Sequence, residues 1–261
     1  MNSFQMTLNL ISPCGGNYDD VMVTVKSVLA VSSQLDNILF KHYLCYNNNL
    51  KPYNSPLSDR NNYEVIELDI NPIQSRSSAR NEGLAQLKGS NDSFVMFLDA
   101  GDLLEMDALA EIPEKVRLPI SDNTLFACSS NIEGENILGT RKPKPNLKYF
   151  INPFYLGSVI MPSQLAIQVS FQEGKKEDWK YWIDILKKEP KIIFIDAPNY
   201  TYKIKNKKEH FYKKSKLIIR QYLFFSKYLN MSIQKAAFHC LIHYIIVFCF
   251  WTIAIKTNKA T

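Results

Sequence analysis

Two aspartates that follow an apolar stretch are the residues of this sequence best placed to do chemistry. The residues from Phe94 to Leu98 are all apolar, with aromatic and β-branched types among them, and they predict a buried strand. Asp99 and Asp102 come next, and Ala100 and Gly101 between them allow a tight turn and the close approach of a ligand. Buried strands of α/β sheets present functional groups at their carboxyl ends, where two carboxylates can hold a divalent cation that binds phosphate. The same residues also fit an Asp-rich surface turn in which Asp102 caps the next helix.

Alternating strands and helices are expected to position these aspartates. In the first half we predict strands over 6–12, 38–46, 63–69 and 94–98, and helices over 21–33, 77–87 and 105–115. This order predicts a largely parallel α/β sheet flanked by helices. In the second half we predict strands over 125–129, 155–161, 192–196 and 200–203, helices over 163–169 and 177–188, and an irregular insertion or hairpin over 131–152.

The charge of the chain is segregated toward its C-terminus. Residues 200–261 contain twelve Lys and Arg against Glu209 alone, a net +11, whereas the rest contains 19 basic and 24 acidic residues, a net −5. A basic segment on an acidic body indicates an anionic partner surface, and the body has no basic stripe for nucleic acid. Five scattered cysteines without C-x-x-C spacing argue against a disulfide framework or a zinc site.

The last part of the chain is predicted to form two helices. Residues 210–229 have the pattern of a basic amphipathic helix, and 236–255 are nearly all apolar. A helix of about 20 residues can span a bilayer, but an aromatic, basic-flanked segment can also lie in the membrane interface or pack on the domain. We expect association with the cytoplasmic face of the inner membrane, with the rest of the chain in the cytoplasm. His239 and His243 lie four residues apart, but no third ligand for a metal is in view.

Three short motifs occur in a characteristic order. They are Ser77-Ser78-Ala79-Arg80-Asn81-Glu82-Gly83-Leu84, then Phe97-Leu98-Asp99-Ala100-Gly101-Asp102, then Glu177-Asp178-Trp179-Lys180-Tyr181-Trp182. In this order and spacing they resemble the A-R-N-x-G, D-x-D-D-like and E-D-W/Y-x-x-W motifs of bacterial family 2 glycosyltransferases, of the surface-polysaccharide type with the GT-A fold. The resemblance covers about residues 5–205. It implies a GT-A domain over 1–205 and a membrane-associating helical tail over 206–261.

The resemblance also implies a reaction and a set of site residues. The reaction is the transfer of a sugar, with inversion, from a nucleotide-diphosphate donor to a hydroxyl of a polysaccharide or lipid-linked acceptor. Asp99 and Asp102 are implied to hold Mg²⁺ or Mn²⁺, which acts as a Lewis acid on the departing diphosphate. Asp178 is implied to be the general base, with Glu177 in reserve. The residues implied to bind the donor are Pro13, Asn47, Arg80, Asn81 and Asp99.

Two departures from the family pattern leave alternatives open. Gly101 stands where the family commonly has an acidic residue, and Cys45-Tyr46-Asn47-Asn48-Asn49 replaces a D-D-G-S-like turn that holds the nucleotide. Acidic residues at the start of a helix, such as Glu177, can also simply complement the helix dipole. A nucleotidyltransferase is disfavoured because the N-terminal region has no Gly-rich phosphate loop followed by a basic residue. A non-catalytic protein that binds a nucleotide sugar or recruits enzymes to the membrane is the alternative.

Overall fold

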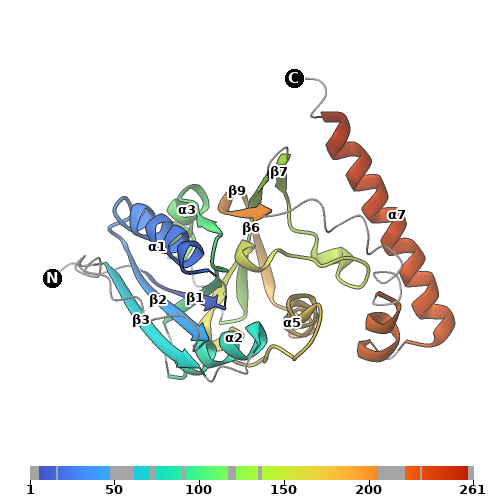
Figure 1. Cartoon of the computed structure of the whole chain (residues 1–261), viewed down its shortest axis with the longest axis horizontal. Coiled ribbons are helices and arrows are strands. Elements are labelled where there is room, and N and C mark those ends of the chain that lie inside the picture. Colours follow the sequence, from blue (N-terminus) through green and yellow to red (C-terminus); the bar gives the residue numbers. More distant parts are fainter. Residues whose placement is uncertain are drawn as a thin grey trace.

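The computed structural model describes residues 6–15, 17–47, 62–70, 75–89, 92–116, 122–134, 137–204, 221–229 and 231–257. In these ranges nine strands form one mixed sheet in the order β3-β2-β1-β4-β8-β6-β9-β5, with β7 paired to β6 (Figure 1). The strands are β1 (Met6–Cys14), β2 (Ile38–Asn47), β3 (Tyr63–Ile70), β4 (Ser93–Phe97), β5 (Leu103–Leu104), β6 (Thr124–Gly134), β7 (Ile137–Arg141), β8 (Val159–Pro162) and β9 (Lys191–Ile204). The helices are α1 (Tyr18–Ser32), α2 (Arg76–Ala85), α3 (Asp107–Val116), α4 (Ser163–Ala166), α5 (Glu177–Leu186) and α7 (Ile233–Thr257).

The sheet is parallel in its first half and mixed in its second, so the prediction of a mostly parallel sheet was wrong. Strands β3, β2, β1 and β4 are parallel neighbours, but β8 runs antiparallel to both β4 and β6, and β5 runs antiparallel to β9. Parallel neighbours need a long crossover, usually a helix. The chain instead returns from β6 through an antiparallel partner, β7. The insertion over 131–152 therefore contains this hairpin, and the two short strands predicted over 192–203 are one strand, β9.

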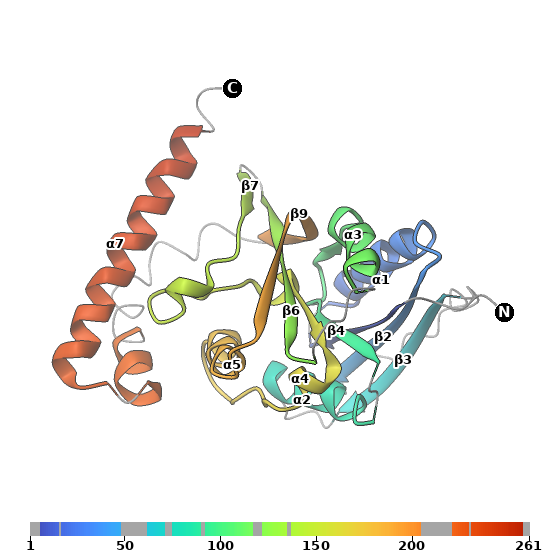
Figure 2. The same cartoon turned by 180° about the vertical axis from the view of Figure 1, so that it is seen from behind.

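Alternate side chains of the central strands build two cores on opposite faces of the sheet. Phe94, Met96 and Leu98 pack with α1 and α3 on one face, whereas Val95 and Phe97 pack with α2 and α5 on the other. Figures 1 and 2 show α1 and α3 side by side, with α2 and α5 away from them. The apolar run before the two aspartates therefore forms the buried strand that its composition predicts.

A glycine allows α2 to lie directly on β1. A Cβ atom on Gly83 would come within 2.6 Å of Cγ2 of Ile11, which is fully buried, so a larger residue would push the helix away. The same helix carries Arg80 one turn earlier. The close approach of α2 to the sheet therefore sets the depth at which the Arg80 guanidinium lies.

The C-terminal part of the chain is described only in pieces. Most of the predicted helix over 210–229 lies outside the described residues, and a π-helical turn covers Phe224–Tyr228. The predicted apolar helix forms α7, along one side of the molecule (Figure 2). Within the described residues, no helix meets the length and hydropathy needed to cross a membrane.

A buried polar network joins the parallel strands just below the carboxyl end of β4. Ser12 Oγ donates to the Leu98 carbonyl at 2.5 Å and lies 2.8 Å from His42 Nε2, and His42 Nδ1 lies 3.1 Å from the Tyr63 hydroxyl. Because the single Ser12 proton is used on Leu98, His42 donates from Nε2, and its Nδ1 accepts from Tyr63. Burial lowers the pKa of His42 to about 3. The ring is therefore neutral at neutral pH.

We expect this histidine to make the protein sensitive to mild acid. The pKa of His42 falls from 6.5 to about 3 on folding, so between these pH values the unfolded chain binds a proton that the folded chain does not. Acidification in this window should therefore cost about 1.4 kcal/mol of folding free energy per pH unit from this group. The free energy of unfolding can be measured with urea at pH 7 and at pH 5. Its decrease between these pH values should be about 2 kcal/mol smaller in His42→Gln than in the wild type. Equal losses in the two proteins would contradict this assignment.

Candidate active site

A side chain of α1, Thr24, bridges the turn from Asp99 to Asp102. Thr24 Oγ1 donates to the Asp102 carbonyl at 2.8 Å and accepts from the Gly101 N–H at 2.8 Å. Gly101 has a φ of 101°, a conformation that residues with a Cβ rarely adopt. The backbone conformation therefore accounts for a glycine at this position. The turn presents the carboxylate of Asp99, which is 31% exposed, above the end of β4.

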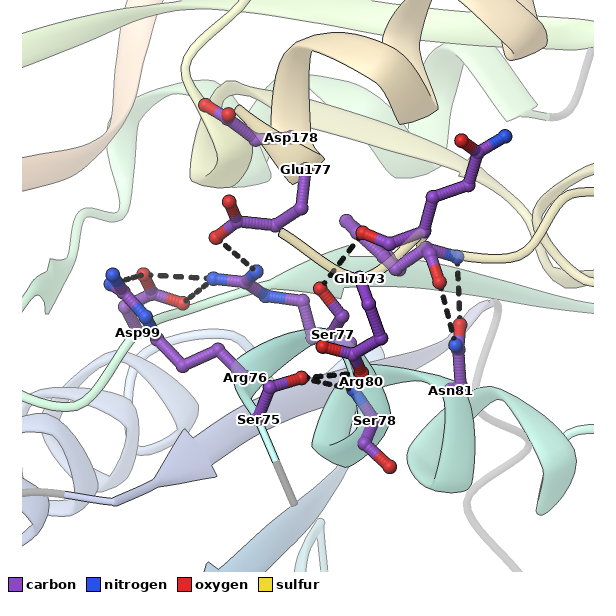
Figure 3. A network of polar contacts seen from close by, with 12 residues as sticks. Ser75, Arg76, Ser77, Ser78, Arg80, Asn81, Asp99, Glu173, Glu177 and Asp178 are labelled. Carbon is purple, nitrogen blue, oxygen red and sulfur yellow. Dashed lines mark hydrogen bonds and ion pairs between the residues drawn. The ribbon is translucent and has the colours of Figure 1, made fainter. Parts of the chain in front are cut away.

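Arg80 links the three sequence motifs (Figure 3). Its Nη2 lies 2.8 Å and 3.0 Å from the two carboxylate oxygens of Asp99, and its Nη1 lies 3.5 Å from Oε1 of Glu177. The Arg80 side chain is only 2% exposed, and its guanidinium lies 5.2 Å from the centre of the Phe171 ring. The buried Arg80 guanidinium thus joins three elements: helix α2, the end of β4 and the start of α5.

The charges around Arg80 outweigh the cost of burying it. Burial alone would lower the pKa of Arg80, but Asp99, Glu177 and Asp178 together raise it above its ordinary value. Its Nε is buried with no hydrogen-bond partner among the described residues. Arg76, one turn earlier and 68% exposed, lies 3.9 Å from Asp99 and adds a second positive charge at the rim of the site.

The other polar residues of α2 hold the segment that leads into α5. Asn81 donates to the Phe171 carbonyl at 2.9 Å and accepts from the Phe171 N–H at 2.8 Å. Ser77 donates to the Gln172 carbonyl at 3.1 Å, and Ser75 donates to Glu173 at 2.5 Å. Both ends of the Asn81 amide are therefore used within the protein. This geometry gives Asn81 a structural task, and the donor contact that the resemblance implies for it stays a prediction.

Asp178 lies at the start of α5 in a desolvated position. Burial raises the pKa of Asp178 above its ordinary value, and the neighbouring charge of Glu177 adds to this. Its Oδ2 accepts a hydrogen bond from Asn152 Nδ2 at 2.6 Å. A carboxylate whose pKa is raised accepts a proton more readily than an ordinary aspartate. Asp178 therefore has the chemistry of a general base.

The two predicted metal ligands, Asp99 and Asp102, differ in how accessible their carboxylates are to a cation. Asp99 is 31% exposed, and one Arg80 nitrogen serves both of its oxygens, so the carboxylate keeps lone pairs for a hard cation. Asp102 is 8% exposed, and its Oδ1 accepts from the Lys203 backbone N–H at 3.2 Å. Within the described residues no group of three or more His, Cys, Asp or Glu side chains could hold a metal ion. The side chains present fit a metal ligand at Asp99, whereas Asp102 ties the turn to β9.

The remaining predicted donor-binding residues lie on β1 and β2. Pro13 is buried in β1 and pairs with Cys45, and Asn47 ends β2 opposite Ile70. Sequence reasoning missed Asn152, the hydrogen-bond partner of Asp178. It lies 26 residues away within the irregular insertion, and no motif marks it.

Comparison with known proteins shows the fold of the chain. No family model and no curated protein matches the sequence. Among solved structures, residues 1–349 of S. aureus TarS superpose with a TM-score of 0.59 at 15% identity, over 92% of this chain and 72% of that one. The TarS 1–349 complex with UDP-GlcNAc gives a TM-score of 0.58 at 15% identity, over 88% of this chain and 69% of that one. Full TarS matches at 0.50 and 17% identity, over 84% of this chain and 40% of that one. At these identities the likeness shows the fold alone, which this chain shares with the TarS 1–349 structures.

Proposed function

We propose that this chain is an inverting glycosyltransferase that uses a nucleotide-diphosphate sugar as its donor. The observation that carries the proposal is the convergence of Asp178, Arg80 and Asp99 at the carboxyl end of β4, with the pKa of Asp178 raised by burial. The complexes of TarS with UDP and with UDP-GlcNAc support a nucleotide-sugar donor. The proposed acceptor is a hydroxyl of a polysaccharide or of a lipid-linked glycan.

In the proposed reaction Asp178 removes the proton of the acceptor hydroxyl. The acceptor oxygen forms a bond to the anomeric carbon while the bond from that carbon to the diphosphate oxygen breaks. The electron pair leaves with the nucleoside diphosphate, and the proton stays on Asp178. A single displacement from the face opposite the leaving group inverts the anomeric configuration. Such a base contributes about 10²–10⁴-fold in rate.

In this proposal the diphosphate lies near Arg76 and Asp99. Arg76 is exposed at the start of α2, where helix N–H groups favour an anion, so it can contact the phosphates directly. Asp99 would hold Mg²⁺ or Mn²⁺, and a bound ion would neutralise the charge that develops on the leaving diphosphate. Arg80 holds the carboxylates of Asp99 and Glu177 in place through its two ion pairs.

Nucleotide binding provides the test of this proposal. We expect one nucleoside diphosphate from a panel of UDP, GDP, CDP and dTDP to raise the melting temperature in the presence of Mn²⁺, because it binds only the folded state. At about 100 times its Kd a ligand adds about 2.7 kcal/mol. Asp99→Ala should lose the Mn²⁺-dependent part of the shift, and Asp196→Ala, at a side chain 82% exposed, should keep it. No shift with any nucleotide would favour a protein without this activity.

We further propose that α7 brings the enzyme to an anionic membrane from the cytoplasmic side. Ile233, Phe238, Leu241 and Ile245 are 49–74% exposed on this helix. The segment 200–261 carries a net +11, which complements anionic lipid. We expect the protein to sediment with phosphatidylglycerol vesicles and not with neutral phosphatidylcholine vesicles, and Phe238→Asp with Leu241→Asp to weaken sedimentation. Equal sedimentation with both lipids would contradict this proposal.

A further inference from the structure

The described C-terminal residues pack on the helix that carries Asp178. Trp179 and Ile183 of α5 form a buried apolar cluster with Phe224, Phe225, Ala236 and Cys240. The rings of Trp179 and Phe224 lie 4.6 Å apart between centroids. In Figures 1 and 2, α7 lies along the side of the molecule that also carries the segment after β7.

Two histidines of α7 hold the segment after β7. His243 Nδ1 lies 2.6 Å from the Phe150 carbonyl, and the rings of His239 and Phe150 are stacked at 4.8 Å with an interplanar angle of 6°. Because a carbonyl can only accept, His243 donates from Nδ1. Burial lowers the pKa of His243, so the ring is neutral at neutral pH. Trp179 Nε1 donates to the Lys148 carbonyl at 2.7 Å and fixes the same segment from α5.

This segment ends at Asn152, whose amide donates to Asp178. Nδ2 of Asn152 lies 2.6 Å from Oδ2 of Asp178, and the Asn152 carbonyl accepts from Arg141 at 2.5 Å. Oδ1 of Asn152 is buried with no partner in the described part of the chain. A buried polar atom without a partner costs stability, and an apolar side chain of the same size would avoid that cost. A buried polar atom that has no partner, and so costs stability, is expected at a residue that serves function.

We propose that Asn152 is a positioning residue for the base, and that α7 holds it in place through His239 and His243. The inference rests on the proposed role of Asp178. By donating to Oδ2, Asn152 restricts the rotation of the Asp178 carboxylate, which takes the proton of the acceptor in the proposed reaction. Two side chains of the C-terminal helix, His239 and His243, thereby help to position the base.

The first variant is Asn152→Leu, which keeps the volume of the side chain and removes the donor. We expect kcat for release of UDP from UDP-GlcNAc to fall by about 10–10²-fold, as when a catalytic group is misplaced, while KM for the donor changes less than about threefold. The melting temperature should change little, because removing the unpartnered amide oxygen offsets the loss of the hydrogen bond to Asp178. Wild-type kcat in this variant, or an equal loss of stability and activity, would overturn the proposal.

The second set of variants tests the contribution of α7. His243→Ala removes the donor to Phe150 and should lower kcat about tenfold, whereas His243→Asn places an amide nitrogen near the same position and should restore most of it. Gln234→Ala, at an exposed position of α7, serves as the matched control and should leave kcat unchanged. If His243→Ala keeps wild-type kcat, α7 does not hold the base.

A titration that needs no turnover separates this inference from the proposed activity. The carboxyl carbon of Asp178 is followed by NMR in the wild type, in Asn152→Leu and in His243→Ala. Lys176, Glu177, Arg80 and Asp99 also act on Asp178, but both substitutions leave them in place. Loss of a hydrogen bond to the charged form should raise the pKa of Asp178 in both variants. If the pKa of Asp178 is the same in both variants as in the wild type, the inference is overturned. If that pKa is raised, the inference is supported. Neither outcome depends on turnover of a donor.

Discussion

Asp178→Asn is expected to reduce sugar transfer about 10³-fold and to leave nucleotide binding unchanged, which is the effect of losing a general base. The substitution removes the Asp178 carboxylate as a proton acceptor, but it keeps the shape of the side chain beside Asn152. We would measure kcat for release of the nucleoside diphosphate that the stabilisation panel identifies, and the Kd of that nucleotide by calorimetry. The combination of lost turnover and intact binding separates a base from a donor-binding residue.

Two control variants make this result specific. Asp184→Asn lies on the same helix, where its carboxylate accepts from Tyr228 and Lys187, and it should retain full kcat. Glu177→Gln should reduce kcat less than Asp178→Asn, because the Glu177 carboxylate is committed to Arg80. If Glu177→Gln instead abolishes transfer and Asp178→Asn does not, the base is Glu177. Full activity in both variants would refute a carboxylate base at the start of α5.

Arg80→Met is expected to destabilise the fold by about 3–5 kcal/mol, the usual cost of removing one partner from a buried ion pair. Methionine fills much of the same volume, but Asp99 and Glu177 then face each other without the cation between them. Arg80 also lowers the pKa of Asp178, so its loss should raise that pKa further. Urea unfolding at pH 7 measures the first effect, and NMR titration of Asp178 measures the second.

Arg76 provides the matched control for Arg80. Both arginines lie on α2 and interact with Asp99, but Arg76 is 68% exposed and 3.9 Å away, whereas Arg80 is 2% exposed and 2.8 Å away. Arg76→Met should therefore change the free energy of unfolding by less than about 1 kcal/mol. Similar losses in the two variants would mean that burial does not set the strength of the Arg80 ion pairs.

The sequence by itself determined the local elements that carry the site. Composition identified β4 as a strand buried on both faces, and periodicity identified α2 and α5 to within a few residues. These assignments are local, because the apolar pattern of a segment decides which face it can bury. Gly101 was also informative, because it was expected to allow a tight turn and has a left-handed φ in the structure.

Only the tertiary structure decided which partner each polar side chain has. Asn81 binds the Phe171 backbone, Asp102 turns toward β9, and Asn152 reaches Asp178 from 26 residues away. The mixed second half of the sheet was likewise outside the reach of local patterns, because strand direction depends on the path of the chain between strands. A side chain forms hydrogen bonds with groups that lie close to it in space. When two segments meet only in the folded protein, their spacing in the sequence does not show that they are close.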